Sequence, residues 1–363
     1  MANCATNSCF CKVCIFICVT IAKLLTFLLA IICLPVVTII VISIFFYRTF
    51  VRFCACCHGD LGGILPSTSA LLAGDEIYKQ PLTCNVAMFQ FEGNCDVSFM
   101  SIFIQDNWLG ATTSEGRFKY SELRQYIVQF MGLFFWKNDT NFDVRNHVKL
   151  YGNEELETVE SQRKLNEIWN ELSMKPFDAG RSPWEVIVIP DFRENSYCGE
   201  GRARWVMIFR WHHCLSDGFS ILNLMSSIAI FDIRKVAKNN DLSTQKSFLS
   251  SCGMATQLIF SAPYVILELL CQSKDKNEWH LSEKKLTRYW HLGVGKNLPI
   301  STIQDIKIGL NVSFSAVLLA AVAGTLRQMM AIQDGEEKKL PESITCGIPL
   351  PICKHPEKLR NNW

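Results

Sequence analysis

The sequence predicts an α/β domain preceded by a transmembrane helix, on the strength of three observations. Residues 24–47 form an apolar run without a charged residue, and such a run is longer than the roughly 20 residues that span a bilayer core. Residues 203–211 read as a strand, and residues 219–231 read as an apolar helix. Hydrophobic residues make up 49% of the 363 residues, which is sufficient for the core of a domain and a membrane segment.

The apolar run divides the N-terminal region into three parts. Residues 1–23 are a Cys-rich segment, residues 24–47 are the predicted transmembrane helix, and residues 48–76 are a juxtamembrane linker. A secretory signal peptide would carry an apolar core of only about 7–15 residues. We therefore expect a retained single-pass anchor. Positive side chains flank both ends of the run, so the charge pattern leaves the topology open.

Cysteine usage indicates the compartment. Nine of the 17 cysteines lie between Cys4 and Cys57, and the other eight are scattered singly. Scattered thiols are typical of a reducing environment, so we expect a cytosolic domain on an endoplasmic reticulum or plasma membrane. Asn138 and Asn311 begin glycosylation sequons, which would favour the opposite side if they were used.

Two cysteine clusters suggest specific chemistry. S-palmitoylation is physically accessible just beyond the apolar run, beside two arginines, at Cys54, Cys56 and Cys57. A zinc site is the alternative for a second cluster, formed by Cys9, Cys11, Cys14 and Cys18. No histidine or polar loop accompanies this second cluster, so we expect no metal.

The net charge of +2 excludes one class of partner. Proteins that bind nucleic acid carry a basic excess or a basic stripe, and this chain has neither. We therefore expect no nucleic-acid partner.

The string HHCLSDG, residues 212–218, carries the strongest functional signal. It lies on a predicted strand-to-helix turn, which would hold an imidazole rigidly while leaving it accessible. His213 is the candidate general base, since imidazole takes up a proton near neutral pH. We expect His212 to point away from His213 if the strand persists, Asp217 to brace the loop, and Gly218 to leave room at a tight turn that a substrate approaches. A structural histidine pair is the competing interpretation.

This HHxxxDG pattern resembles the condensation-domain and chloramphenicol-acetyltransferase-like superfamily, in particular its bifunctional wax ester synthase/diacylglycerol acyltransferases. Four further blocks resemble that branch in the same order: residues 141–148, 175–189, 311–327 and 349–363. The resemblance implies a two-lobed α/β fold. It assigns residues 77–235 to the first lobe, 236–296 to a linker with an apolar helix at 252–271, and 297–363 to a partial second lobe.

Two departures from the family pattern affect this interpretation. Phe314 and Ser315 stand where relatives carry an Asn-Asp pair. The family's second lobe also continues well beyond the Pro-rich block, which corresponds to residues 349–363 here. We therefore expect an incomplete second lobe, as in a fragment or a truncated isoform. Residues 272–285 read as an exposed charged linker.

The resemblance implies transfer of a fatty acyl group from acyl-CoA, as co-substrate, to a fatty alcohol or diacylglycerol at the bilayer, without a permanently bound cofactor. A non-catalytic lipid or acyl-CoA binder is the first alternative, and Phe314 and Ser315 favour it. A soluble acyltransferase of the plant alcohol type is the second. Its Asp-Phe-Gly-Trp-Gly signature is absent from the chain.

Overall fold

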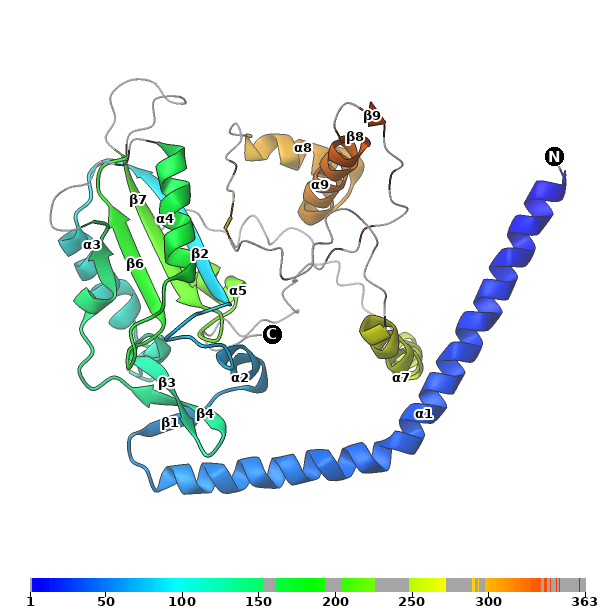
Figure 1. Cartoon of the computed structure of the whole chain (residues 1–363), viewed down its shortest axis with the longest axis horizontal. Helices are drawn as coiled ribbons and strands as arrows, with labels where there is room; N and C mark the ends of the chain where they lie inside the picture. Colours follow the sequence, from blue (N-terminus) through cyan, green and yellow to red (C-terminus); the bar gives the residue numbers. More distant parts are fainter. Residues whose placement is uncertain are drawn as a thin grey trace. The chain divides into compact units, whose positions relative to one another are not determined.

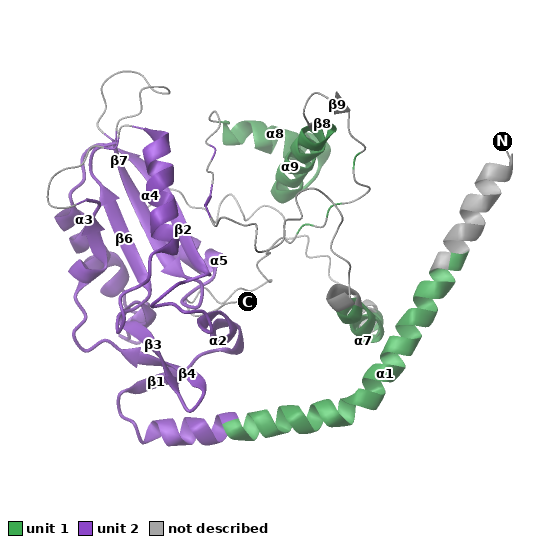
Figure 2. Cartoon of the chain, viewed as in Figure 1, with its two compact units in different colours: residues 1–47, 238–286, 296–347 green, residues 48–237, 287–295, 348–363 purple. Residues whose placement is uncertain are grey.

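A computed structural model of the chain forms two compact units (Figure 2). The first unit comprises residues 1–47, 238–286 and 296–347, and the second comprises residues 48–237, 287–295 and 348–363. The structure describes residues 2–152, 159, 161–192, 204–225, 248–271, 289–290, 293, 298–333, 336–337, 340, 344, 346 and 359. The predicted linker at 272–285 lies outside these residues, as does the Pro-rich block at 349–363 except for Leu359.

The second unit combines helices with two sheets (Figure 1), which confirms the predicted α/β class. Its helices are α2 (Ser67–Ala73), α3 (Val97–Ile104), α4 (Gln162–Met174) and α5 (Gly218–Met225). Its short helical turns are η1 (Gln105–Leu109), η2 (Ser121–Arg124) and η3 (Val144–Asn146). Its strands are β1 (Leu61–Ile64), β2 (Cys84–Glu92), β3 (Gln125–Phe130), β4 (Leu133–Asn138), β5 (Val148–Leu150), β6 (Trp184–Ile189) and β7 (Arg204–His212).

The larger sheet has the strand order β2-β7-β6-β5. Strand β7 pairs antiparallel with both of its neighbours, and β5 pairs parallel with β6. All six residues of β6 are buried, which explains why the strand is apolar except for Glu185, because a strand covered on both faces has no solvent side. The block at 141–148 contains the turn η3 and the start of β5.

The two faces of this sheet differ in what covers them. One face carries alternate residues of β6 and β7, such as Val186 and Phe209, and packs into the main core with Trp108. The other face carries Ile187 and Ile208 and packs against α4. Helix α4 begins at an N-cap, since the Ser161 side chain accepts a hydrogen bond from the Lys164 N–H. It has a strong apolar stripe, which it buries against the sheet.

The smaller sheet has the strand order β1-β4-β3 and supports the last turns of α1 (Ala2–Cys56). Val51 and Ala55 of this helix are buried against Phe135 of β4. The Arg48 guanidinium donates to the carbonyl of Leu65 at 2.7 Å. The end of α1 is thus part of the core of the second unit.

The N-terminal helix α1 contains the whole predicted transmembrane run and extends beyond both of its ends. Its segment Phe16–Cys56 is long and apolar enough to cross a membrane. The hydroxyls of Thr20, Thr26 and Ser43 donate to carbonyls four residues earlier, at 2.8–2.9 Å. These polar groups therefore need no water, which suits an apolar solvent.

The first unit contains three further helices, α7 (Phe248–Cys271), α8 (Ile300–Leu310) and α9 (Phe314–Ala331), and the short strands β8 (Ile332–Gln333) and β9 (Glu336–Glu337). Helix α7 covers the predicted apolar helix at 252–271 and continues through Pro263. Asn311 ends α8 in the left-handed conformation, with φ of 51°. Helix α9 is also long and apolar enough to cross a membrane.

Candidate active site

The HHCLSDG turn joins β7 to α5 and is held by the residues that immediately precede the two strands flanking β7. The His212 N–H donates to the carbonyl of Pro183 at 2.9 Å, and the His213 N–H donates to the carbonyl of Thr83 at 2.9 Å. The Leu215 N–H then donates back to the His212 carbonyl at 3.0 Å, which starts the turn. The backbone of the two histidines is therefore fixed from two directions.

The structure places the two imidazoles in different environments. His213 is partly exposed, whereas His212 is fully buried. His213 follows directly after the last residue of β7. Of the two histidines, only His213 is therefore accessible to a substrate, as a general base must be.

His212 is held by ring contacts on both of its nitrogens. Its Nε2 lies 3.2 Å from Asp75 Oδ2 and 3.0 Å from Thr83 Oγ1. Its Nδ1 lies 3.3 Å from the Cys214 N–H donor nitrogen and 2.9 Å from the Cys214 sulfur. Burial lowers the pKa of His212 more than the nearby carboxylate of Asp75 raises it, so the ring is neutral at pH 7.

These contacts determine which ring nitrogen of His212 carries the proton. A carboxylate oxygen can only accept, so Nε2–H must donate towards Asp75. Nδ1 is then the acceptor for the Cys214 N–H, which is a donor in every protonation state. The neutral Nε2–H tautomer bonds both Asp75 and the Cys214 N–H. The Nδ1–H tautomer would bond neither of them and would have only the Thr83 hydroxyl and the Cys214 sulfur as partners.

Asp75 is a member of this site that sequence reasoning missed. It follows α2 and lies 137 residues before His212, in a loop without a periodic pattern. Burial alone would raise the pKa of Asp75, but hydrogen bonds from Thr83, His212 and Leu82 outweigh it and hold the pKa below the ordinary value. The side chain is only 6% exposed, so a charged, buried carboxylate lies against the ring of His212, the residue before the candidate base.

Asp217 and Gly218 lie at the start of α5. The Asp217 carboxylate accepts a hydrogen bond from the Ser220 N–H at 2.8 Å and thereby caps the helix. A Cβ built on Gly218 would meet no described atom within 4 Å, and its φ is not in the left-handed region. Crowding by the described residues is therefore not what requires glycine at this position.

A buried ion pair, Arg210 with Glu185, lies on the same face of the larger sheet as His212. Arg210 and Glu185 are directly paired across β7 and β6, and their side chains are 3.2 Å apart. The Arg210 guanidinium also donates to the Lys175 carbonyl at the end of α4, and it stacks on Phe177 at 4.1 Å. Lys149 donates to Glu185 at 2.6 Å. The face therefore changes from apolar beneath α4 to ionic beside His212.

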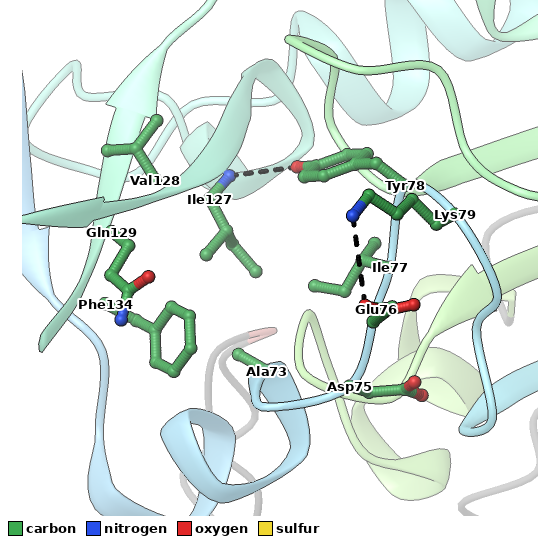
Figure 3. A pocket seen from close by; sticks show the side chains of 10 residues that line it. All are labelled: Ala73, Asp75, Glu76, Ile77, Tyr78, Lys79, Ile127, Val128, Gln129 and Phe134. Atoms are coloured by element: carbon green, nitrogen blue, oxygen red, sulfur yellow. Dashed lines mark hydrogen bonds and ion pairs between the residues drawn. The ribbon is translucent and has the colours of Figure 1, made fainter. Parts of the chain in front are cut away.

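A hollow of about 240 Å³ is lined in part by the loop that carries Asp75 (Figure 3). Its walls come from the end of α2, the loop after it, β3 and β4, and they include Ala73, Ile77, Ile127 and Phe134. Figure 3 shows the carboxylate of Asp75 pointing away from Phe134 on the opposite wall.

Metal ligation finds no support among the described side chains. No group of three or more His, Cys, Asp or Glu residues within them could hold an ion. Cys14 and Cys18 are described as exposed, whereas the side chains of Cys9 and Cys11 lie outside the described set.

The family model for the wax ester synthase/diacylglycerol acyltransferase catalytic domain matches residues 122–253. The matched segment contains the HHCLSDG turn, Glu185 and Arg210, but not Asp75. The match confirms the resemblance drawn from the sequence.

Individual relatives are distant. A putative diacylglycerol O-acyltransferase of Mycobacterium bovis and a probable one of Mycobacterium tuberculosis are each 21% identical over 233 residues, covering 59% of this chain. The chain spans about half the length of the curated relatives it matches, at 47% of each.

Two solved structures show the same partial coverage. The wax ester synthase/diacylglycerol acyltransferase from Marinobacter aquaeolei VT8 is 19% identical with a TM-score of 0.32, covering 46% of this chain and 36% of that one. The first condensation domain of the CDA synthetase is 10% identical with a TM-score of 0.33, covering 47% and 37%.

Proposed function

We propose that this chain is a membrane-bound O-acyltransferase that moves a fatty acyl group from acyl-CoA to a fatty alcohol or diacylglycerol. The observation that carries the proposal is the HHCLSDG turn, which lies within the segment matched by the acyltransferase family model. At that turn His213 is partly exposed above a buried His212.

The proposed reaction needs one base and no covalent enzyme intermediate. His213 accepts the proton of the hydroxyl group as its oxygen attacks the carbonyl carbon of the thioester. The carbon–sulfur bond then breaks, and the imidazolium returns the proton to the sulfur, which leaves as free CoA beside the new ester. A positioned base contributes about 10²- to 10⁴-fold in rate. Alignment of the two bound substrates contributes further, because it removes the entropy cost of their encounter.

The other members of the motif support the base without touching the reacting atoms. Asp217 braces the loop by capping α5. Gly218 is exposed and uncrowded, so we assign its missing side chain to substrate approach.

The membrane part of the proposal rests on α1. Its apolar surface is exposed and its hydroxyls are satisfied within the helix. A single-pass anchor in the endoplasmic reticulum or plasma membrane, with the catalytic domain in the cytosol, would bring the domain to substrates dissolved in the bilayer. Cys56 and Cys57 are exposed and Cys54 is partly exposed, so these three thiols are accessible for S-palmitoylation.

The test is ester formation by the full chain in membranes of a host that lacks neutral lipids. Labelled oleoyl-CoA is supplied with hexadecanol or diacylglycerol, and His213→Ala is compared with the wild type. Arg163→Ala is the control, because that side chain is 90% exposed on α4. We expect ester from the wild type and the control and none from His213→Ala.

Two other outcomes would contradict the proposal. Equal ester from His213→Ala would remove this residue from the mechanism. A folded wild type that makes no ester but binds acyl-CoA would indicate a lipid or acyl-CoA binder. Phe314 and Ser315, which begin helix α9 in place of the family's Asn-Asp pair, favour that second function.

A further inference from the structure

The Oδ2 atom of Asp75 gathers an unusual number of donors. It accepts hydrogen bonds from the Leu82 N–H at 2.5 Å, the Thr83 N–H at 2.8 Å, the Thr83 hydroxyl at 3.2 Å and His212 Nε2 at 3.2 Å. Of the protein side chains, an ionised carboxylate suits this position best, since it accepts without donating. Charge-assisted hydrogen bonds of this kind are also stronger than neutral ones.

Two of these contacts lead to the backbone of His213 by separate routes. On one side, Asp75 holds the Thr83 N–H, and the Thr83 carbonyl accepts the His213 N–H at 2.9 Å. On the other side, Asp75 fixes Nε2–H of His212, which leaves Nδ1 free to accept the Cys214 N–H. One carboxylate therefore acts on the residue before His213 and on the residue after it.

The loop that carries Asp75 is itself anchored. The Tyr78 hydroxyl accepts a hydrogen bond from the Ile127 N–H of β3 at 3.2 Å (Figure 3). The Phe177 N–H donates to the Ile77 carbonyl at 3.2 Å. Burial raises the pKa of Tyr78, so the hydroxyl stays protonated at physiological pH. The position of the carboxylate is therefore fixed by contacts that do not involve His212.

We propose that Asp75, which lies outside the segment matched by the family model, is the positioning residue of the candidate base. It holds His212 in one tautomer and the Thr83 backbone in one place, and together these set the backbone of His213. The link to catalysis rests on the proposed acyltransferase function, whereas the link to His212 does not.

The first measurement needs no activity. The full chain is labelled with ¹⁵N-histidine in lipid nanodiscs, and the ring nitrogens of His212 are assigned by comparison with His212→Gln. Wild type and Glu76→Gln should show the Nε2–H tautomer alone, and Asp75→Ala should show a mixture. Glu76→Gln is the matched control. It removes one carboxylate charge at the residue next to Asp75, and the Glu76 side chain is 65% exposed.

The second measurement is ester formation by the same variants. Asp75→Ala should lower kcat by about 10²-fold with little change in KM, because a small displacement of a catalytic group has that effect on rate while the substrate contacts remain. Glu76→Gln should match the wild type. If Asp75→Ala does not fold, Asp75→Leu, which keeps about the same size but has no acceptor oxygen, takes its place in both measurements.

The outcomes separate the two proposals. An unchanged His212 tautomer in Asp75→Ala overturns the positioning role, and so does a kcat equal to that of Glu76→Gln or a loss confined to KM. If the wild type makes no ester, the acyltransferase proposal fails, and the tautomer measurement alone decides the role of Asp75.

Discussion

Removing either partner of the buried Arg210–Glu185 pair should destabilise the second unit, and the two losses should be unequal. Both side chains are almost fully buried, at 0% and 5% exposure. Breaking such a pair costs about 3–5 kcal/mol, because it leaves one charge buried without its partner. The remaining contacts of each partner decide where in this range the two variants fall.

Arg210→Met should fall at the lower end of the range. Glu185 would still accept from Lys149 at 2.6 Å, and the amine of Lys149 is partly exposed to water. Glu185→Leu should fall at the upper end, because Arg210 would then keep contacts with the Lys175 carbonyl, the Phe177 ring and the Cys84 thiol, none of which is a carboxylate. For a unit of this size the lower figure corresponds to a fall of about 6–12 °C in melting temperature.

The assay is thermal melting of the full chain in detergent, followed by tryptophan fluorescence. The second unit contains buried tryptophans that report on it, among them Trp108, Trp136 and Trp184. Arg163→Ala, which breaks the exposed ion pair with Glu167, should have the same melting temperature as the wild type.

The double variant Arg210→Met with Glu185→Leu should recover most of the lost stability, since apolar replacements of buried pairs are often neutral. The Nε atom of Arg210 is buried without an acceptor among the described residues, which adds to that recovery. If Arg210→Met has the same melting temperature as Arg163→Ala, or if the double variant is less stable than both single variants, the reasoning is refuted.

Two further predictions concern pH and backbone packing. Burial lowers the pKa of His147. Its ring stacks on the Trp184 ring and is hydrogen-bonded through Nδ1 to the Trp184 carbonyl. As pH falls, the unfolded chain therefore takes up a proton at this histidine before the folded chain does, so the free energy of unfolding should fall as pH drops below about 6.5. In His147→Phe the free energy of unfolding should depend less steeply on pH. An unchanged pH dependence in this variant would contradict the assignment to His147. Gly62→Ala should destabilise by about 1–3 kcal/mol, since the added Cβ would lie 2.9 Å from the Trp136 carbonyl oxygen. Gly63→Ala, with open space at its Cβ, is the control in the same melting assay, and equal melting of the two variants would disprove the packing argument.

The sequence predicts the elements around the candidate base because their patterns are local. The apolar strand, the polar turn and the apolar helix follow one another within residues 203–231, and the structure forms β7 and α5 there. Residues 226–231 of the predicted helix lie outside the described residues. The long uncharged run likewise predicts α1, although not how far the helix continues on either side.

The contacts that complete the site could not be predicted in this way. Asp75 meets His212 across 137 residues, and no local pattern specifies which loop reaches a given strand end. The Arg210–Glu185 pair left a weak signal, namely opposite charges inside two otherwise apolar strands. Only the pairing of β6 with β7 shows that the two charges face one another.

Strand β2 pairs with β7 over nine residues, and the last pair joins Cys84 to His212. A slip of one residue turns every side chain of a strand to the opposite face. Removing a single residue from the middle of β7 would therefore exchange the surroundings of the His212 and His213 side chains, although the HHCLSDG sequence itself would be unchanged. Small insertions and deletions in this strand should thus be more damaging than many substitutions, because the register of β7 against β2 decides which of the two imidazoles is accessible.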